Sequence, residues 1–220
     1  MRGAGPQAAA TLNRAMAPRL LLALIVTGLL ALTAIAGVLL FAVGDGAVRG
    51  TEFAGAIRPP TATAPPMNLR DERGDMVRMS ELRGTPVVVT FLYTTCEDTC
   101  PLTAAQIRGA LDELGHDVPV IAVSVDPAND TPAKARSYAF KQKLDGRMRW
   151  VLGDAGRLQR IWRAFGVQPQ GGGREHSAST VLLDGRGRQR VGFATDVLTS
   201  SALAHDIAAL EREQRGRGGS

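Results

Sequence analysis

The stretch Val87–Pro101, VVVTFLYTTCEDTCP, decides the fold of this chain and holds its only two cysteines. It begins with six β-branched and apolar residues, a run typical of a strand that is buried on both faces. A short polar loop with Cys96 and Cys100 follows, and Pro101 then suits the first turn of a helix, where its missing N–H leaves no bond unmade. The pattern therefore predicts that both cysteines lie where a central strand passes into a helix.

This junction favours thiol chemistry. The residues from Leu102 to Leu114 have a helical rhythm, and the N–H groups at the start of such a helix favour the thiolate form of both cysteines. If the loop turns helically, the four-residue spacing brings the two sulfur atoms together. A structural disulfide is the alternative in an exported protein, but one that closes so short a loop adds little stability. We therefore expect redox exchange or metal binding at Cys96 and Cys100.

The three histidines of the chain differ in their settings. His116 follows a Leu-Gly pair that is typical of a helix end and is expected on the surface, and His205 lies off the apolar face of the last expected helix. His176 stands in REHSAST, after a glycine-rich loop and just before a strand, where its side chain is placed to reach a neighbouring strand's end. With two thiols and three histidines, the four ligands of a structural zinc site would need both cysteines and two histidines, or an oxygen ligand.

The N-terminal part of the chain predicts a membrane anchor. Residues 20–43 carry no charge, amide or proline and are numerous enough to span a bilayer. Arginines but no acidic residues precede them, so residues 1–19 are expected in the cytoplasm and the rest of the chain outside it. A cleaved signal peptide, with Ala34–Ala36 as a weak cleavage site, is the alternative, which the length of the apolar run disfavours. Residues 44–66 are rich in proline and alanine and are expected to form a tether.

Residues 67–213 have the pattern of one α/β domain with a mixed sheet. A hairpin over 67–80 is expected before the cysteine stretch. The elements expected after the cysteine stretch and its helix are a buried strand over 118–125, a helix from Thr131 to about Leu144, a strand over 148–152, a helix capped by Asp154, a hairpin of 179–183 and 189–194, and a helix over 200–212. Residues 214–220 are expected to be disordered. The net charge of +5 comes from scattered arginines without a basic block, so we expect no nucleic-acid partner.

Three blocks of the sequence resemble the Sco/SenC family. TFLYTTCEDTCPLT resembles its C-P-D-x-C-P motif, and AVSVDPANDTPAKARSYA resembles its S-V-D-P block followed by D-T-P. EHSASTVLLDGRGR resembles its third block, in which a histidine precedes a hairpin strand. Asp98 matches the acidic position between the two cysteines, whereas Glu97 stands where proline is usual and is expected to loosen the loop. The blocks follow one another in the family's order, which makes the resemblance specific.

This resemblance implies a thioredoxin-like domain, a central mixed β-sheet flanked by helices, after one N-terminal transmembrane helix. It implies that Cys96, Cys100 and His176 bind one copper ion, Cu(I) or Cu(II), in a metallochaperone for the binuclear copper centre of cytochrome c oxidase. Soft thiolates and an imidazole also suit copper on chemical grounds, and an exposed site allows the metal to be passed on. The implied partners are the copper-site subunit of the oxidase and a periplasmic copper donor or thiol reductant. The arginine bias before the apolar run, together with a composition rich in arginine, alanine and glycine, predicts the bacterial inner membrane as the location, with the domain facing the periplasm or the cell exterior.

Two enzymatic alternatives remain open. A thiol–disulfide oxidoreductase would use Cys96 and Cys100 as a redox-active pair to reduce the oxidase copper site or another exported client, and would not need His176. A peroxidase of the peroxiredoxin type is favoured by Thr94 and Thr95 before Cys96, but the motif contains no activating arginine. A test of the imidazole therefore separates a copper chaperone from a thiol reductase.

Overall fold

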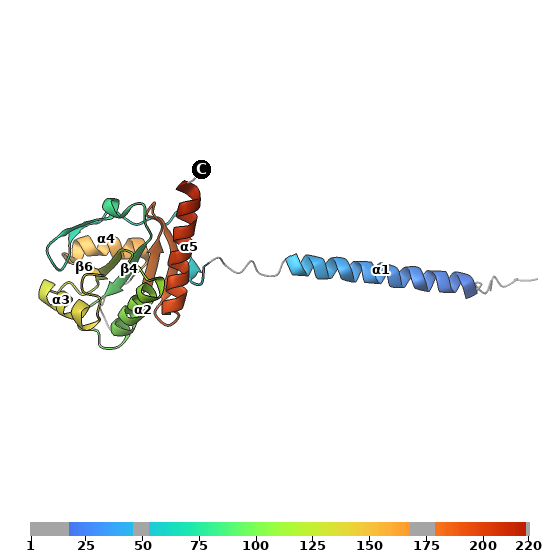
Figure 1. Cartoon of the computed structure of the whole chain (residues 1–220), viewed down its shortest axis with the longest axis horizontal. Helices are drawn as coiled ribbons and strands as arrows, with labels where there is room; N and C mark the ends of the chain where they lie inside the picture. The colour runs from blue at the N-terminus through green and yellow to red at the C-terminus, as the bar shows by residue number, and fades with distance from the viewer. Residues whose placement is uncertain (1–17, 46–52, 168–178, 219–220) are drawn as a thin grey trace, which may run out of the picture. The chain divides into compact units, whose positions relative to one another are not determined.

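The computed structural model describes residues 18–45, 53–167 and 179–218, which fall into two compact units, Met1–Arg49 and Gly50–Ser220 (Figure 1). In the first unit, helix α1 (Pro18–Asp45) is described, with side chains placed from Leu22 to Ile35. These side chains are exposed, and the Thr33 hydroxyl donates to the carbonyl oxygens of the preceding turn. Judged over the described residues, no helix combines the length and the apolar character needed to cross a membrane.

The second unit is built on a six-stranded sheet with the strand order β1-β8-β7-β4-β5-β6. The strands are β1 (Ala56–Ile57), β4 (Val87–Leu92), β5 (Val120–Ser124), β6 (Arg149–Val151), β7 (Ser179–Leu183) and β8 (Gln189–Ala194). Strand β4 pairs in parallel with β5 on one side and antiparallel with β7 on the other. The predicted mixed sheet is confirmed, and β4 is buried along its whole length because it has a neighbour at each edge and a layer on each face.

The residues of β4 alternate between two hydrophobic cores, since successive side chains of a strand point to opposite faces. Val88 and Leu92 pack into the core beneath α2 (Thr99–Leu114), α3 (Pro132–Lys141) and α5 (Ser200–Gly218). Val89 and Phe91 pack into the core beneath α4 (Ala155–Phe165), where the ring of Phe91 lies 5.3 Å from that of Phe165. The domain thus has three layers, with α2 and α5 side by side on one face of the sheet (Figure 1).

A second, two-stranded sheet completes the α4 face. Strands β2 (Asn68–Arg70) and β3 (Met76–Arg78) form the predicted hairpin around Gly74, which has a φ of 89°, and a 3-10 helix, η1 (Met79–Leu82), follows. The backbone N–H of Leu152 donates to the carbonyl oxygen of Arg70 at 3.0 Å and joins the hairpin to the main sheet. The hairpin therefore covers the core from the side that α4 leaves open.

Sequence and structure agree on the helix starts. Thr131 caps α3 by accepting the N–H of Lys134, and Asp154 caps α4 by accepting the N–H of Arg157 at 2.9 Å. Helix α3 ends at Lys141, three residues before the expected end near Leu144.

Two boundaries differ from the sequence-based expectation. The expected tether, residues 44–66, is packed on the domain from Phe53 onward, because Phe53 is buried, β1 pairs with β8, and Asp206 accepts the N–H groups of Ala54 and Gly55 at 2.7 and 2.9 Å. The expected disordered tail, residues 214–220, is helical as far as Gly218. A paired carboxylate and guanidinium, Glu213 and Arg190 at 2.8 Å, attaches this last part of α5 to the sheet.

Candidate functional site

The two cysteines lie at the carboxyl end of β4, in and after the segment Tyr93–Asp98, which we call the cysteine loop. The N–H of Cys96 donates to the carbonyl oxygen of Tyr93 at 3.3 Å and closes a tight turn. The N–H of Thr94 donates to the carboxylate of Asp130 at 2.7 Å, which ties the loop to the segment after β5. The strand-to-helix junction predicted for both cysteines is confirmed.

Asp130 is a buried support of the cysteine loop that no local pattern of the sequence indicated. Its carboxylate accepts the N–H of Thr94 and the hydroxyl of Ser124, and the carbonyl oxygen of Ser124 accepts the indole N–H of Trp162 at 2.9 Å. Burial raises the pKa of Asp130, and the hydrogen bonds from Ser124 and Thr94 only partly oppose this effect. Asp130 stands in the SVDPANDTP block, but nothing in the sequence alone says which loop that block supports.

The sulfur of Cys96 takes the place of a capping oxygen at the start of α2. Asp98 occupies the N-cap position, yet its side chain makes no capping hydrogen bond. Instead the N–H of Cys100 donates to the sulfur of Cys96 at 3.2 Å, and the hydroxyl of Thr99 lies 3.4 Å from the same atom. Because the free N–H groups of a helix start carry partial positive charge, they stabilise a negative charge on this sulfur.

The two thiols have opposite acidities. Burial raises the pKa of Cys96, but hydrogen bonds from the Cys100 thiol, the Thr99 hydroxyl, the Cys100 N–H and Tyr93 outweigh it, so that the net pKa is lowered. Burial raises the pKa of Cys100 far above the range of an ordinary thiol, and its hydrogen bond to Cys96 raises it further. The expectation that the helix start favours both thiolates is therefore wrong for Cys100, because that side chain points into the core.

The site is also less open than expected. Cys96 is 8% exposed and Cys100 is fully buried, so the two sulfurs of the expected exposed copper site lie largely inside the protein. The aromatic pair Tyr138 and Trp150, with ring centroids 5.1 Å apart, belongs to the same core, and the pKa of Tyr138 is raised by burial and by the nearby sulfurs. Within the described part of the chain, the buried hydroxyl of Tyr138 has no hydrogen-bond partner.

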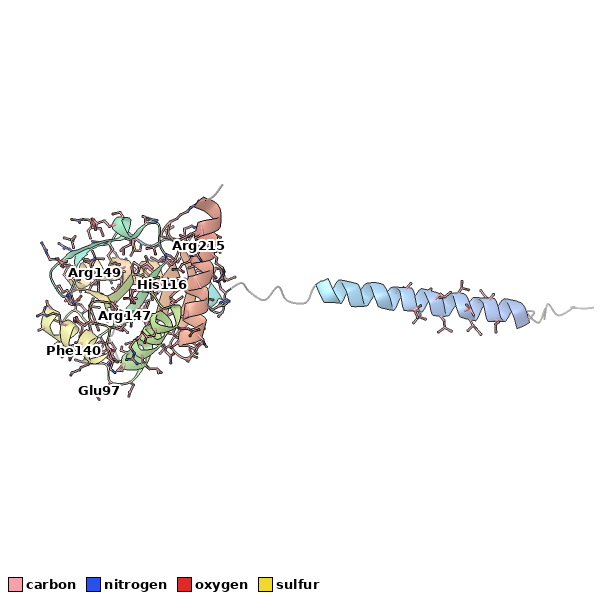
Figure 2. All side chains as sticks on the ribbon, viewed as in Figure 1. Glu97, His116, Phe140, Arg147, Arg149 and Arg215 are labelled. Atoms are coloured by element: carbon pink, nitrogen blue, oxygen red, sulfur yellow. The ribbon has the colours of Figure 1, made fainter. Side chains whose placement is uncertain are left out.

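The third predicted ligand, His176, lies outside the described residues. The other histidines are on the surface, as expected: His116, labelled in Figure 2, is paired with Glu211 at 2.8 Å, which raises its pKa, and His205 contacts Asp206. Glu97 is exposed at the rim of the cysteine loop (Figure 2). Among the described residues, no three His, Cys, Asp or Glu side chains cluster closely enough to hold a metal.

The sequence of this chain is similar to those of known proteins of one family. Residues 55–211 match the SCO1/SenC family. The chain belongs to this family, as its motifs predicted. Protein SenC of Rhodobacter capsulatus is 30% identical over 129 residues, which cover 54% of this chain and 58% of that protein. The SCO1 protein homolog of Bacillus subtilis is 31% identical over 82 residues, 36% of this chain and 42% of that protein. The chain thus spans less than two thirds of the length of these two curated relatives.

Solved structures of family members cover the domain more completely. Bradyrhizobium japonicum ScoI with copper bound has 30% sequence identity and a TM-score of 0.57, over 67% of this chain and 98% of that chain. Apo Sco1 from Thermus thermophilus has 27% identity and a TM-score of 0.58, over 72% of this chain and 96% of that chain. These likenesses confirm the predicted α/β thioredoxin-like fold of the Sco proteins, with a mixed central sheet and flanking helices.

Proposed function

We propose that this SCO1/SenC protein is a membrane-anchored copper metallochaperone that assists assembly of the binuclear copper centre of cytochrome c oxidase. The observation that carries the proposal is the pair of sulfurs on one turn at the start of α2, in a chain that belongs to this family. Copper is the cargo, and its proposed ligands are the sulfurs of Cys96 and Cys100 and the imidazole of His176.

The chemistry of the donor set fits Cu(I). Two thiolates buried this deeply would carry two negative charges in an apolar setting, and burial accordingly raises the pKa of Cys100, which favours its protonated form. A monovalent copper ion removes one of these charges, so metal binding and loss of the Cys100 proton favour each other. A neutral imidazole from His176 would add a ligand without adding charge.

A thiol–disulfide oxidoreductase is the second candidate, and the opposite acidities of the two thiols favour it. Cys96, with its lowered pKa, suits attack on a client disulfide, and Cys100 suits resolution of the mixed disulfide that forms. The client would leave as a dithiol, the Cys96–Cys100 pair would become a disulfide, and a thiol reductant would have to restore it.

The proposed anchor is the apolar segment 20–43. Its two threonines, Thr27 and Thr33, donate their hydroxyls to carbonyl oxygens of their own helix, which satisfies them without water. The arginines before the segment favour residues 1–19 in the cytoplasm and the domain in the periplasm or outside the cell. An alkaline phosphatase fused after Ser220 is expected to be active in intact cells, and release of the protein into the soluble fraction would argue against the anchor.

Copper titration of the reduced full-length protein tests the function. We expect one copper ion per chain, lost in Cys96→Ala and strongly weakened in His176→Ala, with His205→Ala as the matched control because His205 lies on the surface of α5. The oxidoreductase hypothesis predicts instead that His176→Ala still cycles between dithiol and disulfide and still supports oxidase assembly. Normal oxidase in cells that carry His176→Ala, together with its loss in Cys96→Ala cells, would reject the copper-donor proposal.

A further inference from the structure

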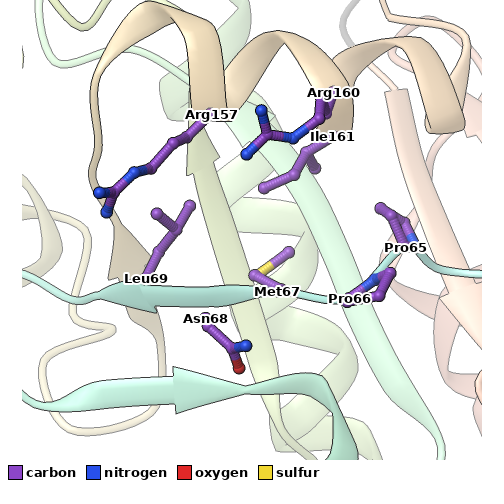
Figure 3. A pocket seen from close by; sticks show the side chains of 8 residues that line it. All are labelled: Pro65, Pro66, Met67, Asn68, Leu69, Arg157, Arg160 and Ile161. Carbon is purple, nitrogen blue, oxygen red and sulfur yellow. The ribbon is translucent and has the colours of Figure 1, made fainter.

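A groove lies between β2 and α4, on the α4 face of the domain (Figure 3). It has a volume of about 370 Å³, and its buried floor is formed by side chains of Met67, Leu69 and Ile161. Arg157 and Arg160 extend from α4 over this floor toward β2 (Figure 3). The groove therefore combines an apolar base with a positively charged wall.

The two arginines are available to an anion. The remaining residues that line the groove, prolines and one asparagine, are uncharged, and no acidic residue of the described parts of the chain lines it. Arg157 pairs with Asp154 at 3.1 Å, but both side chains are about 60% exposed, so this pair contributes little and exchanges readily. Within residues 53–167 and 179–218, Arg160 has no ion pair or side-chain hydrogen bond.

The opposite wall offers backbone groups. The carbonyl oxygen of Met67 accepts the N–H of Met79 and the N–H of Asp71 donates to Asp75, so these alternate residues face β3. Arg70 faces the other edge, where its carbonyl oxygen accepts the N–H of Leu152. Asn68 is two residues from Arg70 and shares that edge, because strand residues alternate in direction. Its backbone N–H and C=O therefore point away from β3, at the edge of β2 that lies beside the groove, and among the described residues β2 has no strand paired to Asn68 at this edge.

We propose that this groove binds an extended acidic segment of a partner protein. The segment would pair its backbone with Asn68 and place acidic side chains at alternate positions beside Arg157 and Arg160. The spacing suits this arrangement: residues three apart on a helix have Cβ atoms about 5–6 Å apart, and alternate residues of a strand lie about 7 Å apart on one face. An apolar residue of the segment would cover the floor. The groove contains neither cysteine, so the inference is independent of copper binding.

The unpaired backbone edge of β2 favours a protein segment over a lipid headgroup as the occupant of the groove. A headgroup would use the arginines but has no N–H or C=O ladder to meet the edge of β2. The two occupants are therefore distinguished by measuring whether binding depends on the backbone N–H groups of the ligand as well as on its negative charge.

The test uses the full-length chain in neutral detergent and a fluorescein-labelled peptide, Ser-Asp-Val-Asp-Val-Ser, measured by fluorescence polarisation. We expect saturable binding that is about threefold weaker in Arg160→Gln and about tenfold weaker when Arg157→Gln is added. Arg163→Gln is the matched control, because Arg163 is exposed on the same helix but does not line the groove. It is expected to bind within twofold of wild type. All variants should keep the copper stoichiometry and melting temperature of the wild type, since these exposed arginines support neither.

Altered peptides and a headgroup analogue test whether binding needs both the charge and the backbone of the ligand. Two altered peptides are expected to lose binding. The peptide with asparagine in place of both aspartates lacks the negative charge, and the peptide with an N-methyl group on the valine between the aspartates lacks that backbone N–H donor. Equal weakening by Arg163→Gln would indicate diffuse charge and overturn the proposal. So would unchanged binding of the N-methylated peptide. If glycerol phosphate binds through Arg157 and Arg160 while the peptide does not, the groove is a headgroup site and a peptide partner is rejected.

Discussion

Asp130→Ala is expected to destabilise the domain and to release the cysteine loop. The carboxylate accepts two hydrogen bonds, from the N–H of Thr94 at 2.7 Å and from the hydroxyl of Ser124, and Asp130 is 8% exposed. Hydrogen bonds to a charged group are worth about 1.5–3 kcal/mol each, and alanine leaves both donors without this partner. Burial raises the pKa of Asp130, which means that its negative charge is itself unfavourable at this position, and removal of the charge offsets part of the lost hydrogen-bond energy. We therefore expect the free energy of unfolding to fall by about 2–4 kcal/mol.

Asp130→Asn is the matched control. Its amide oxygen can still accept the N–H of Thr94, and the buried charge is absent, so we expect a loss of about 1 kcal/mol or less. Both changes are measured by urea unfolding, followed through the fluorescence of Trp150 and Trp162, which are the two tryptophans of the chain and are both buried.

The reactivity of Cys96 provides a second measurement. Thr94 is two residues before Cys96, so releasing its N–H is expected to loosen the turn that places Cys96 at the start of α2. In Asp130→Ala the pKa of Cys96, followed by the pH dependence of iodoacetamide alkylation, should rise toward that of an ordinary thiol. If alanine is no more destabilising than asparagine, or if the alkylation profile is unchanged, Asp130 does not support the loop in the way described.

Asp71, Tyr138 and the Cys96–Cys100 pair each allow a further test of the structure. Arg149 and the N–H groups of Arg73 and Asp75 hold the pKa of Asp71 below its ordinary value, against the effect of burial. The ionised Asp71 carboxylate therefore stabilises the folded state above about pH 4, and this stabilisation is lost as the pH falls through the lowered pKa of Asp71 in the folded protein. The difference in unfolding free energy between wild type and Asp71→Asn should therefore shrink at acid pH, and a constant difference would refute this linkage. Tyr138→Phe removes a buried hydroxyl without a partner among the described residues, and the domain should be unchanged or up to about 1 kcal/mol more stable by urea unfolding; a clear loss would reveal an unrecognised bond. Protein with a Cys96–Cys100 disulfide should bind no stoichiometric copper by equilibrium dialysis until it is reduced, because ligation needs the same two sulfurs; tight binding by the oxidised protein would place the ligands elsewhere.

The central elements were predictable because their signals are local. The apolar run of β4, the proline after Cys100, the cap of α4 at Asp154 and the turn at Gly74 each depend on a few neighbouring residues. The errors at the two boundaries have a different origin. Phe53 and the N–H groups after it are held by Asp206 and β8, more than 130 residues away, and a proline-rich composition does not reveal such partners.

The sequence by itself determined the strand-to-helix junction, the spacing of Cys96 and Cys100 and the family of the chain. Only the tertiary structure decided which of the two sulfurs is acidic. Cys96 receives the N–H of Cys100 at the start of α2, whereas Cys100 is enclosed by the core that α3 and β6 help to build. The pKa of a thiol depends on the solvent, dipoles and side chains around it, and elements from distant parts of the chain supply these. Two cysteines four residues apart therefore have opposite acidities for a reason that their spacing does not contain.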